Sequence, residues 1–155
     1  MNTRTWILSS LVTLAVIAGL NTIWYTVLMN DFYLDNFLLH DTGRDQPLMI
    51  PLVAANVLIA FTMAFLYERW SGGRHSLSHG LLFGAVVGIL AVPTMDLMIY
   101  SLSSVVTERG VLVDSLAGVV IYSCAGFCIA YVHKVIEQAK HAVGTDVEVT
   151  DSYIR

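Results

Sequence analysis

Two aspartates stand among apolar residues in the second half of the chain. Asp96 follows an apolar run that contains Pro93, and Asp114 opens the next apolar run. A carboxylate inside a membrane-length apolar segment is costly, so it is a candidate for binding a ligand, an ion or a proton. Two plainer roles stay open. Asp96 can be a buried structural acid bonded to a polar neighbour, and Asp114 can cap a helix, because the N-terminus of a helix favours a carboxylate.

The composition of the chain shows the setting of these acids. Of 155 residues, 56% are hydrophobic and 13% are charged, whereas a soluble domain is about a quarter charged. The length is that of one domain. The formal net charge is −4, and no basic block predicts binding to nucleic acid. We therefore expect a membrane protein whose surroundings are the lipid bilayer.

Four apolar stretches are long enough to cross a hydrocarbon core of about 30 Å, and in lipid they must be helices. The first could be a signal peptide, but its uncharged run is long enough to span, so we interpret it as a retained helix. We predict an all-α fold, an integral membrane four-helix up-down bundle over residues 1–143. Residues 144–155 form a polar tail, and a short amphipathic segment lies in the first outer loop. The expected spans are about 6–29, 47–67, 80–101 and 111–132.

The positive charges predict the orientation of the bundle. With the N-terminus inside, six Lys and Arg residues lie on the inner side and two, Arg44 and Arg109, on the outer side. Cytoplasmic segments carry the excess of positive charge. Both termini are therefore expected in the cytoplasm.

In this orientation each span places one polar residue in the outer half of the bundle. At 1.5 Å per residue these positions lie roughly 4–15 Å below the outer surface. The inner half is almost purely apolar, so we expect a site open to the outside rather than a through-channel. Tyr25 and Thr94 are further candidates to join the layer. The predicted ligand-binding residues are Asn21, Asn56, Asp96, Tyr100 and Asp114.

Proline and glycine predict how the helices bend and pack. Pro93 cannot donate a hydrogen bond to the Ile89 carbonyl, so we expect a kink and a hinge just before Asp96. Small residues let helix backbones approach closely in a membrane. The predicted packing residues are Gly80, Gly84, Gly88, Gly118 and Gly126.

Other reactive side chains have simpler explanations. His75 and His79 have a spacing that suits a metal, but they lie at the inner interface and we interpret them as interfacial residues. His79 and His133 could bracket a haem iron, which no midplane histidine supports. Cys124 and Cys128 are interpreted as small core residues. Phosphate-loop, serine-hydrolase and zinc-protease motifs are missing from the sequence, so we expect no metal, no cofactor and no enzyme activity.

The same residues resemble a family of small four-span bacterial membrane proteins, domain-of-unknown-function family 2177. The family pattern has an Asp and a Trp near the end of the first helix, then Phe-Tyr; here the matching residues are Asn21, Trp24, Phe32 and Tyr33. Its third and fourth helices match Phe83, Gly84, Ala85, Gly88, Asp96, Leu97, Asp114 and Gly118. Asn21 replaces the usual Asp, and Met98–Ile99 replace Thr-Asn, which implies a reduced site. The resemblance implies a bacterial inner-membrane location and no particular activity.

Three functions remain as hypotheses. The first is binding, and also transport in a homodimer, of a small solute, cation or proton at the acidic layer. The second is an accessory or assembly subunit of a larger membrane complex, which suits the small size and the glycine-rich helices. The third is a membrane enzyme or redox subunit. The sequence identifies no ligand.

Overall fold

The computed structural model of the protein describes residues 3–37, 48–73 and 75–152, and these residues are almost entirely helical. Four helical stretches are long and apolar enough to cross a membrane: Thr3–Leu28, Met49–Ser71, Leu77–Leu102 and Glu108–Ala139. The predicted all-α, four-helix membrane architecture is confirmed. In chain order the elements are α1 (Thr3–Thr22), η1 (Ile23–Leu28), α2 (Asn30–Asn36), α3 (Met49–Ser71), α4 (Leu77–Ala91), α5 (Pro93–Leu102) and α6 (Glu108–Ser152).

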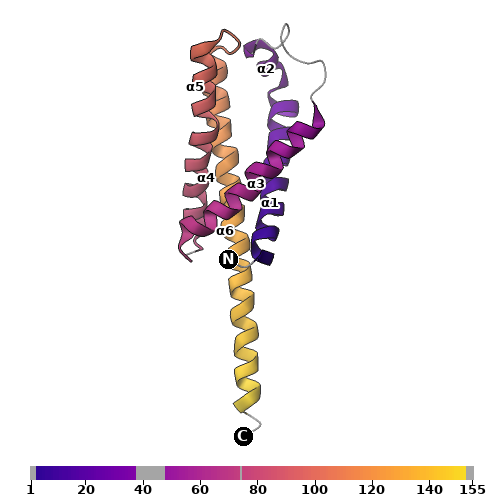
Figure 1. Cartoon of the computed structure of the whole chain (residues 1–155), viewed down its shortest axis with the longest axis vertical. Helices are drawn as coiled ribbons and strands as arrows, with labels where there is room; N and C mark the ends of the chain where they lie inside the picture. Colours follow the sequence, from indigo (N-terminus) through magenta and orange to yellow (C-terminus); the bar gives the residue numbers. More distant parts are fainter. Residues whose placement is uncertain (1–2, 38–47, 74, 153–155) are drawn as a thin grey trace.

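Helix α6 is the centre of the bundle (Figure 1). It packs against α4 and α5 on one side and against α1 on the other. Helix α3 packs chiefly on α1 and crosses the bundle obliquely (Figure 1). Beyond the bundle α6 continues as a single helix to Ser152. We call the end that carries α2 and the α5–α6 connection the α2 end, and the end at the α3–α4 turn the opposite end.

Helix α3 contributes to the core through only half of its length. Ala60, Met63, Ala64 and Tyr67 are buried, whereas every residue from Met49 to Ala55 is exposed. The oblique crossing carries the first half of α3 away from α6. The four spans therefore do not surround a common axis at the α2 end, as a regular bundle would.

The third span is divided at Pro93. Helix α4 ends at Ala91 and α5 begins at Pro93, which occupies a first-turn position that tolerates proline. Pro93 has no N–H to donate to the Ile89 carbonyl. The Thr94 hydroxyl donates a 3.2 Å hydrogen bond to that carbonyl instead. The interruption predicted from Pro93 is therefore present, and a neighbouring hydroxyl compensates part of its cost.

The α4–α6 contact is built from glycines. A Cβ at Gly84 would collide with the Tyr122 carbonyl oxygen, and one at Gly126 would collide with the Gly80 carbonyl oxygen. A Cβ at Gly88 would lie 2.9 Å from the Val119 Cα, and one at Gly118 would lie 2.6 Å from the Val92 side chain. All five glycines that the sequence analysis named for packing lie at this contact or at its continuation to Val92.

The interior between the two ends of the bundle is mainly apolar, although Ser9, Ser10 and Thr13 of α1 are also fully buried. Its buried cluster comprises Ile17, Met63, Tyr67, Phe83, Ala125, Ile129 and Ala130. Cys124 and Cys128 are half-buried free thiols on α6. At the opposite end the rings of His75 and His133 lie 4.6 Å apart between centroids, and Tyr67 packs against both. His79 is exposed, so the two histidines at metal-like spacing differ in their surroundings.

Candidate functional site

The two aspartates singled out in the sequence come together near the α2 end of the bundle. Asp96 on α5 is 6% exposed and Asp114 on α6 is 8% exposed. Their carboxyl groups lie close enough for the two charges to interact. Each lies six residues from the end of its span, at Leu102 and Glu108, or about 9 Å along the helix. The Ser115 hydroxyl donates a 3.2 Å hydrogen bond to Asp96 Oδ2.

Two tyrosines from the N-terminal part of the chain cover Asp114. The Tyr25 hydroxyl donates a hydrogen bond of 2.7 Å to Asp114 Oδ1, and the Tyr33 hydroxyl donates one of 2.6 Å to the same oxygen. The Trp24 indole Nε1 donates a 3.1 Å hydrogen bond to the Tyr33 hydroxyl oxygen. We call Asp96, Asp114, Tyr25 and Tyr33 the acid–tyrosine cluster.

The segment that contributes Tyr25 to this cluster adopts an unusual helix. Over Ile23–Leu28 the backbone forms a π-helix, and the Met29 N–H bonds the Trp24 carbonyl at 2.9 Å, five residues back. Two consecutive side chains of this segment, Trp24 and Tyr25, reach the cluster. π-helical turns inside α-helices are rare and are frequent at functional sites. The local distortion thus coincides with the place where α1 meets the acids.

Helix α2 is held in place by the start of α6. The Thr107 N–H donates a 2.9 Å bond to the Asn36 carbonyl, and the Thr107 hydroxyl donates a 2.7 Å bond to Asn36 Oδ1. Phe37 and Val106 form an antiparallel bridge. These contacts hold α2, and with it Tyr33, over the acids.

The same threonine caps α6. The Gly110 N–H donates a 3.1 Å bond to the Thr107 hydroxyl, which is a typical N-cap interaction. The capping role considered for Asp114 is therefore wrong, because α6 begins at Glu108, earlier than expected. Asp114 instead lies in the second turn and directs its carboxylate to the tyrosines.

A pocket of about 380 Å³ lies between η1, α2 and α6 and includes Asp114 in its lining. We call it the aromatic pocket, because three of its residues carry aromatic rings. Burial, and then the hydrogen bond to Asp114, raise the pKa of the Tyr33 hydroxyl above its ordinary value. Tyr33 therefore stays a neutral hydrogen-bond donor to the carboxylate. The pocket is lined by Tyr25, Asn30, Tyr33, Leu34, Phe37 and Asp114.

The other predicted ligand-binding residues lie outside the cluster. Asn21 is half-buried on α1, and none of the side-chain hydrogen bonds among the described residues involves it. Asn56 donates to the Leu52 carbonyl of its own helix at 2.8 Å, on the half of α3 that diverges from the bundle. Tyr100 is 44% exposed. The structure brings together Asp96 and Asp114 and leaves these three residues apart from them.

Three contributors were not identified as site residues from the sequence. Trp24 and Tyr33 appeared only as positions in the family pattern, and Ser115 was not noted. One sequence feature could have indicated Trp24 and Tyr33 as site residues: the family pattern combines a tryptophan and a Phe-Tyr pair with two downstream aspartates. Predicting Tyr33 required knowing that α2 folds back over α6.

The fold and the site together define a class: an all-helical, multi-span membrane protein with a pair of buried acids near one end. The chain belongs to the family described as "Predicted membrane protein (DUF2177)", whose model matches residues 6–131. The resemblance found in the sequence is thus confirmed. A search of curated proteins and a search of solved structures gave no match to the chain.

Proposed function

We propose that this protein binds a proton or a small cation between Asp96 and Asp114, without catalysing a reaction. The observation that supports the proposal is the proximity of two buried carboxyl groups: Ser115, the chain neighbour of Asp114, donates a hydrogen bond to Asp96. The interactions described for Asp96 come from Asp114 and Ser115, and none comes from Lys or Arg. Two carboxylates that share a site repel each other when both are ionised. A proton or a cation between them removes this repulsion.

The hydrogen bonds of the cluster distinguish the two acids. Asp114 accepts hydrogen bonds from two tyrosine hydroxyls, which stabilise its ionised form. Asp96 accepts one longer hydrogen bond, from Ser115. Asp96 is therefore the better position for a bound proton, and Asp114 for the remaining negative charge.

For the setting, we propose the bacterial inner membrane with both termini in the cytoplasm. The excess of Lys and Arg at the termini and at the α3–α4 turn supports this orientation. The α2 end, with the aromatic pocket, then faces the outside. A solute from that side would reach Asp114 through the pocket.

Binding is better supported than conduction through a single copy. Between the acid–tyrosine cluster and the opposite end, the buried cluster is mostly hydrocarbon, and apart from the Tyr67 hydroxyl its members offer an ion no ligands. The buried hydroxyls of Ser9, Ser10 and Thr13 donate hydrogen bonds to carbonyls of their own helix. Transport would therefore need a homodimer, with a pathway between copies. In that case the break at Pro93, directly before Asp96, would act as the hinge.

The test compares wild type with Asp96→Asn in detergent. In wild type we expect the midpoint of thermal unfolding to fall as the pH rises from about 5 to 8, because the folded pair holds a proton that the unfolded chain releases. Na⁺ or Mg²⁺ should restore part of the loss if a cation replaces the proton. Asp96→Asn removes the repulsion and should flatten this pH dependence.

The matched control is Asp35→Asn, which neutralises an exposed acid on α2 at the same end of the bundle. It should keep the pH dependence of wild type. Equal pH and cation responses in wild type and in Asp96→Asn would contradict the proposal.

A second candidate function is that of an accessory subunit. It is favoured by α3, whose residues from Met49 to Ala55 are all exposed within the part of the chain that the structure describes. A helix of a larger membrane complex would cover them. Cross-linking from Val53 should then capture a partner in membranes, whereas a purified, stable form of this chain alone would count against the accessory role.

A further inference from the structure

The aromatic rings that line the aromatic pocket indicate an organic cation as the ligand, in preference to an inorganic ion. The ring centroids of Tyr25 and Tyr33 lie 4.8 Å apart, and those of Tyr33 and Phe37 lie 5.0 Å apart. All three rings line the pocket together with the Asp114 carboxylate. A proton or a metal ion requires no aromatic wall. An organic ammonium group gains from one, because the faces of aromatic rings attract cations, above all when water is excluded.

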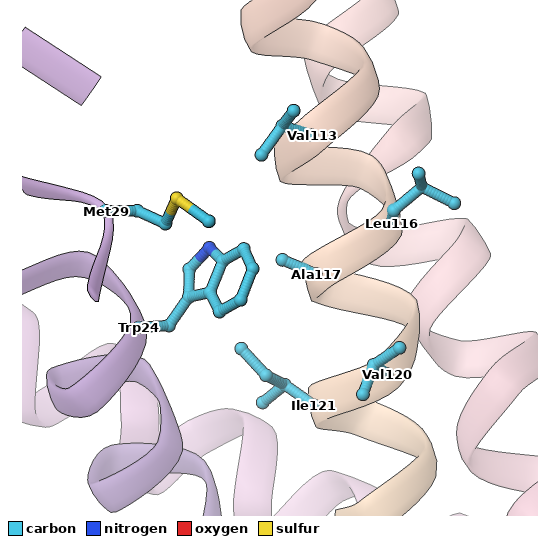
Figure 2. Close-up of a pocket in the computed structure, with 7 residues that line it drawn as sticks. All are labelled: Trp24, Met29, Val113, Leu116, Ala117, Val120 and Ile121. Atoms are coloured by element: carbon cyan, nitrogen blue, oxygen red, sulfur yellow. The ribbon is translucent and has the colours of Figure 1, made fainter. Parts of the chain in front are cut away.

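A second cavity lies beside this pocket, between η1 and α6. It has a volume of about 370 Å³. Figure 2 shows the Trp24 indole reaching from η1 toward α6, with Met29 on one side and Ile121 on the other. We call this cavity the Trp24 groove. Its residues are Trp24, Met29, Val113, Leu116, Ala117, Val120 and Ile121, all of them apolar apart from the indole N–H.

The two cavities are adjacent. Met29 and Val113 line the groove, and their chain neighbours Asn30 and Asp114 line the aromatic pocket. Trp24 lines the groove with its ring and donates its N–H to Tyr33, which lines the pocket. The aromatic pocket, which contains a carboxylate, and the apolar Trp24 groove thus lie on either side of the Trp24 indole.

We propose that the ligand is an amphiphile with an organic ammonium head and one alkyl chain. The head lies at Asp114 among the three aromatic rings, and the chain lies along the Trp24 groove. This inference rests on the proposed function, because it names an organic cation for the Asp114 side of the acid pair. Among the residues that the structure describes, no Lys or Arg lines either cavity, so a phosphate group on the head would find no partner among them. A phosphate-free ammonium amphiphile therefore fits better than a phospholipid.

The alkyl chain of the amphiphile strengthens binding by anchoring the ammonium head, not by hydrophobic transfer. A hydrocarbon chain gains little when it moves from lipid to an apolar groove, since both are apolar. When the alkyl chain lies in the Trp24 groove, the ammonium head is held near Asp114. A head without a chain, or a chain without a charge, should therefore bind poorly.

The test uses the full chain in a nonionic maltoside detergent, with Trp6→Phe and Trp70→Phe so that Trp24 is the remaining tryptophan. Dodecyltrimethylammonium, tetramethylammonium and dodecanol are titrated, and Trp24 emission and the unfolding midpoint are followed. We expect a saturable change with dodecyltrimethylammonium, half-complete at a concentration at least tenfold lower than with tetramethylammonium. Dodecanol should give no saturable change.

The variants separate specific binding from partition into the micelle. Asp114→Asn should weaken the dodecyltrimethylammonium response at least tenfold, while Asp35→Asn leaves it unchanged. Val120→Phe, which fills the groove, should weaken the same response severalfold. Leu112→Phe adds the same ring at another exposed position of α6, outside the groove, and should have no effect. A soluble phosphocholine amphiphile that binds as tightly as dodecyltrimethylammonium would replace the proposed ligand with a phospholipid.

Failure of this inference differs from failure of the proposed function. An equal dodecyltrimethylammonium response in wild type and in Asp114→Asn would contradict the proposal that the ligand is an ammonium amphiphile. If the pH and inorganic-cation dependence of stability still required Asp96, proton or cation binding would stand. If that dependence were absent as well, both proposals would fall.

Discussion

Helix α6 meets its neighbours in two opposite ways. Toward α4 it presents glycines, and the backbones approach so closely that a single added Cβ at Gly84 would collide with a carbonyl oxygen. Toward η1 and α2 it presents Asp114, and there it leaves two cavities of about 370 and 380 Å³. One side of the helix is in close backbone contact with its neighbour, and the other has polar groups and two cavities.

The difference separates scaffold from site on one helix. Close backbone contact in a membrane depends on van der Waals packing of small residues, and it leaves no place for a ligand. On the other side, the π-helix of η1 and the fold-back of α2 bring Trp24, Tyr25 and Tyr33 to the acid. The α4–α6 contact fixes the position of α6. The site then forms where α6 meets η1 and α2 more loosely.

The largest effect is expected at the glycine contact. Gly84→Leu places a side chain against the backbone of Tyr122 and Ser123, where neither partner can move aside. We expect a loss of more than about 3 kcal/mol, at or beyond the upper end of overpacking costs, and so little folded protein. Gly19→Leu is the control, because nothing lies within 4 Å of a Cβ there. Size-exclusion profiles in detergent that were alike for both variants would contradict the tight contact.

The sequence predicted this contact because small residues at a spacing of four form a ridge on any helix. The four spans and the break at Pro93 also followed from local properties: length, hydropathy and the missing proline N–H. Asp96 and Asp114 could be named because a carboxylate is rare in an apolar run. Each of these features is contained in one helix.

The rest of the site depends on contacts between distant segments. Tyr33 reaches Asp114 across 81 positions of sequence and Tyr25 across 89, and no helical periodicity predicts such pairs. Asn56 was expected in the polar layer because its distance from the outer end of its helix falls in the same range as those of the other polar residues. The oblique path of α3 removes it from the cluster, and depth alone does not predict a crossing angle.

A smaller loss is expected from separating α2 from α6. Thr107→Val removes the N-cap of α6 and the hydrogen bond to Asn36 Oδ1. Loss of a cap costs about 0.5–2 kcal/mol, and the second bond adds about 1 kcal/mol. Protease sensitivity near α2 should rise together with the fall in unfolding midpoint. Thr26→Val removes only a hydroxyl bonded to its own helix, so an equal effect there would contradict the role of Thr107.

Tyr33→Phe tests one bond of the cluster. We expect a loss of about 1 kcal/mol at neutral pH, because one donor to the Asp114 carboxylate disappears. The pKa of Tyr33 is raised in the folded state, so its contribution is complete below about pH 10 and is lost as the pH rises above that value. The wild-type advantage over Tyr33→Phe in unfolding midpoint should therefore shrink above about pH 10. An advantage independent of pH would contradict the burial of this hydroxyl.

The smallest effect is expected at Asn56. Its amide bonds the carbonyl of its own helix, on the diverging half of α3. Asn56→Ala should change stability by less than about 0.5 kcal/mol and should leave the pH and cation responses of the cluster unchanged. A loss of those responses in a titration of the unfolding midpoint would show that α3 closes onto the acids.

The central claim is that Asp96 and Asp114 hold a proton or a cation between them. Infrared spectroscopy of the purified protein at neutral pH tests it most directly, since a protonated carboxyl has a C=O stretch distinct from that of a carboxylate. Wild type should show a buried protonated carboxyl that Asp96→Asn removes, or one that disappears on saturation with a cation. A wild-type spectrum without this band, unchanged by Asp96→Asn and by cations, would contradict the claim.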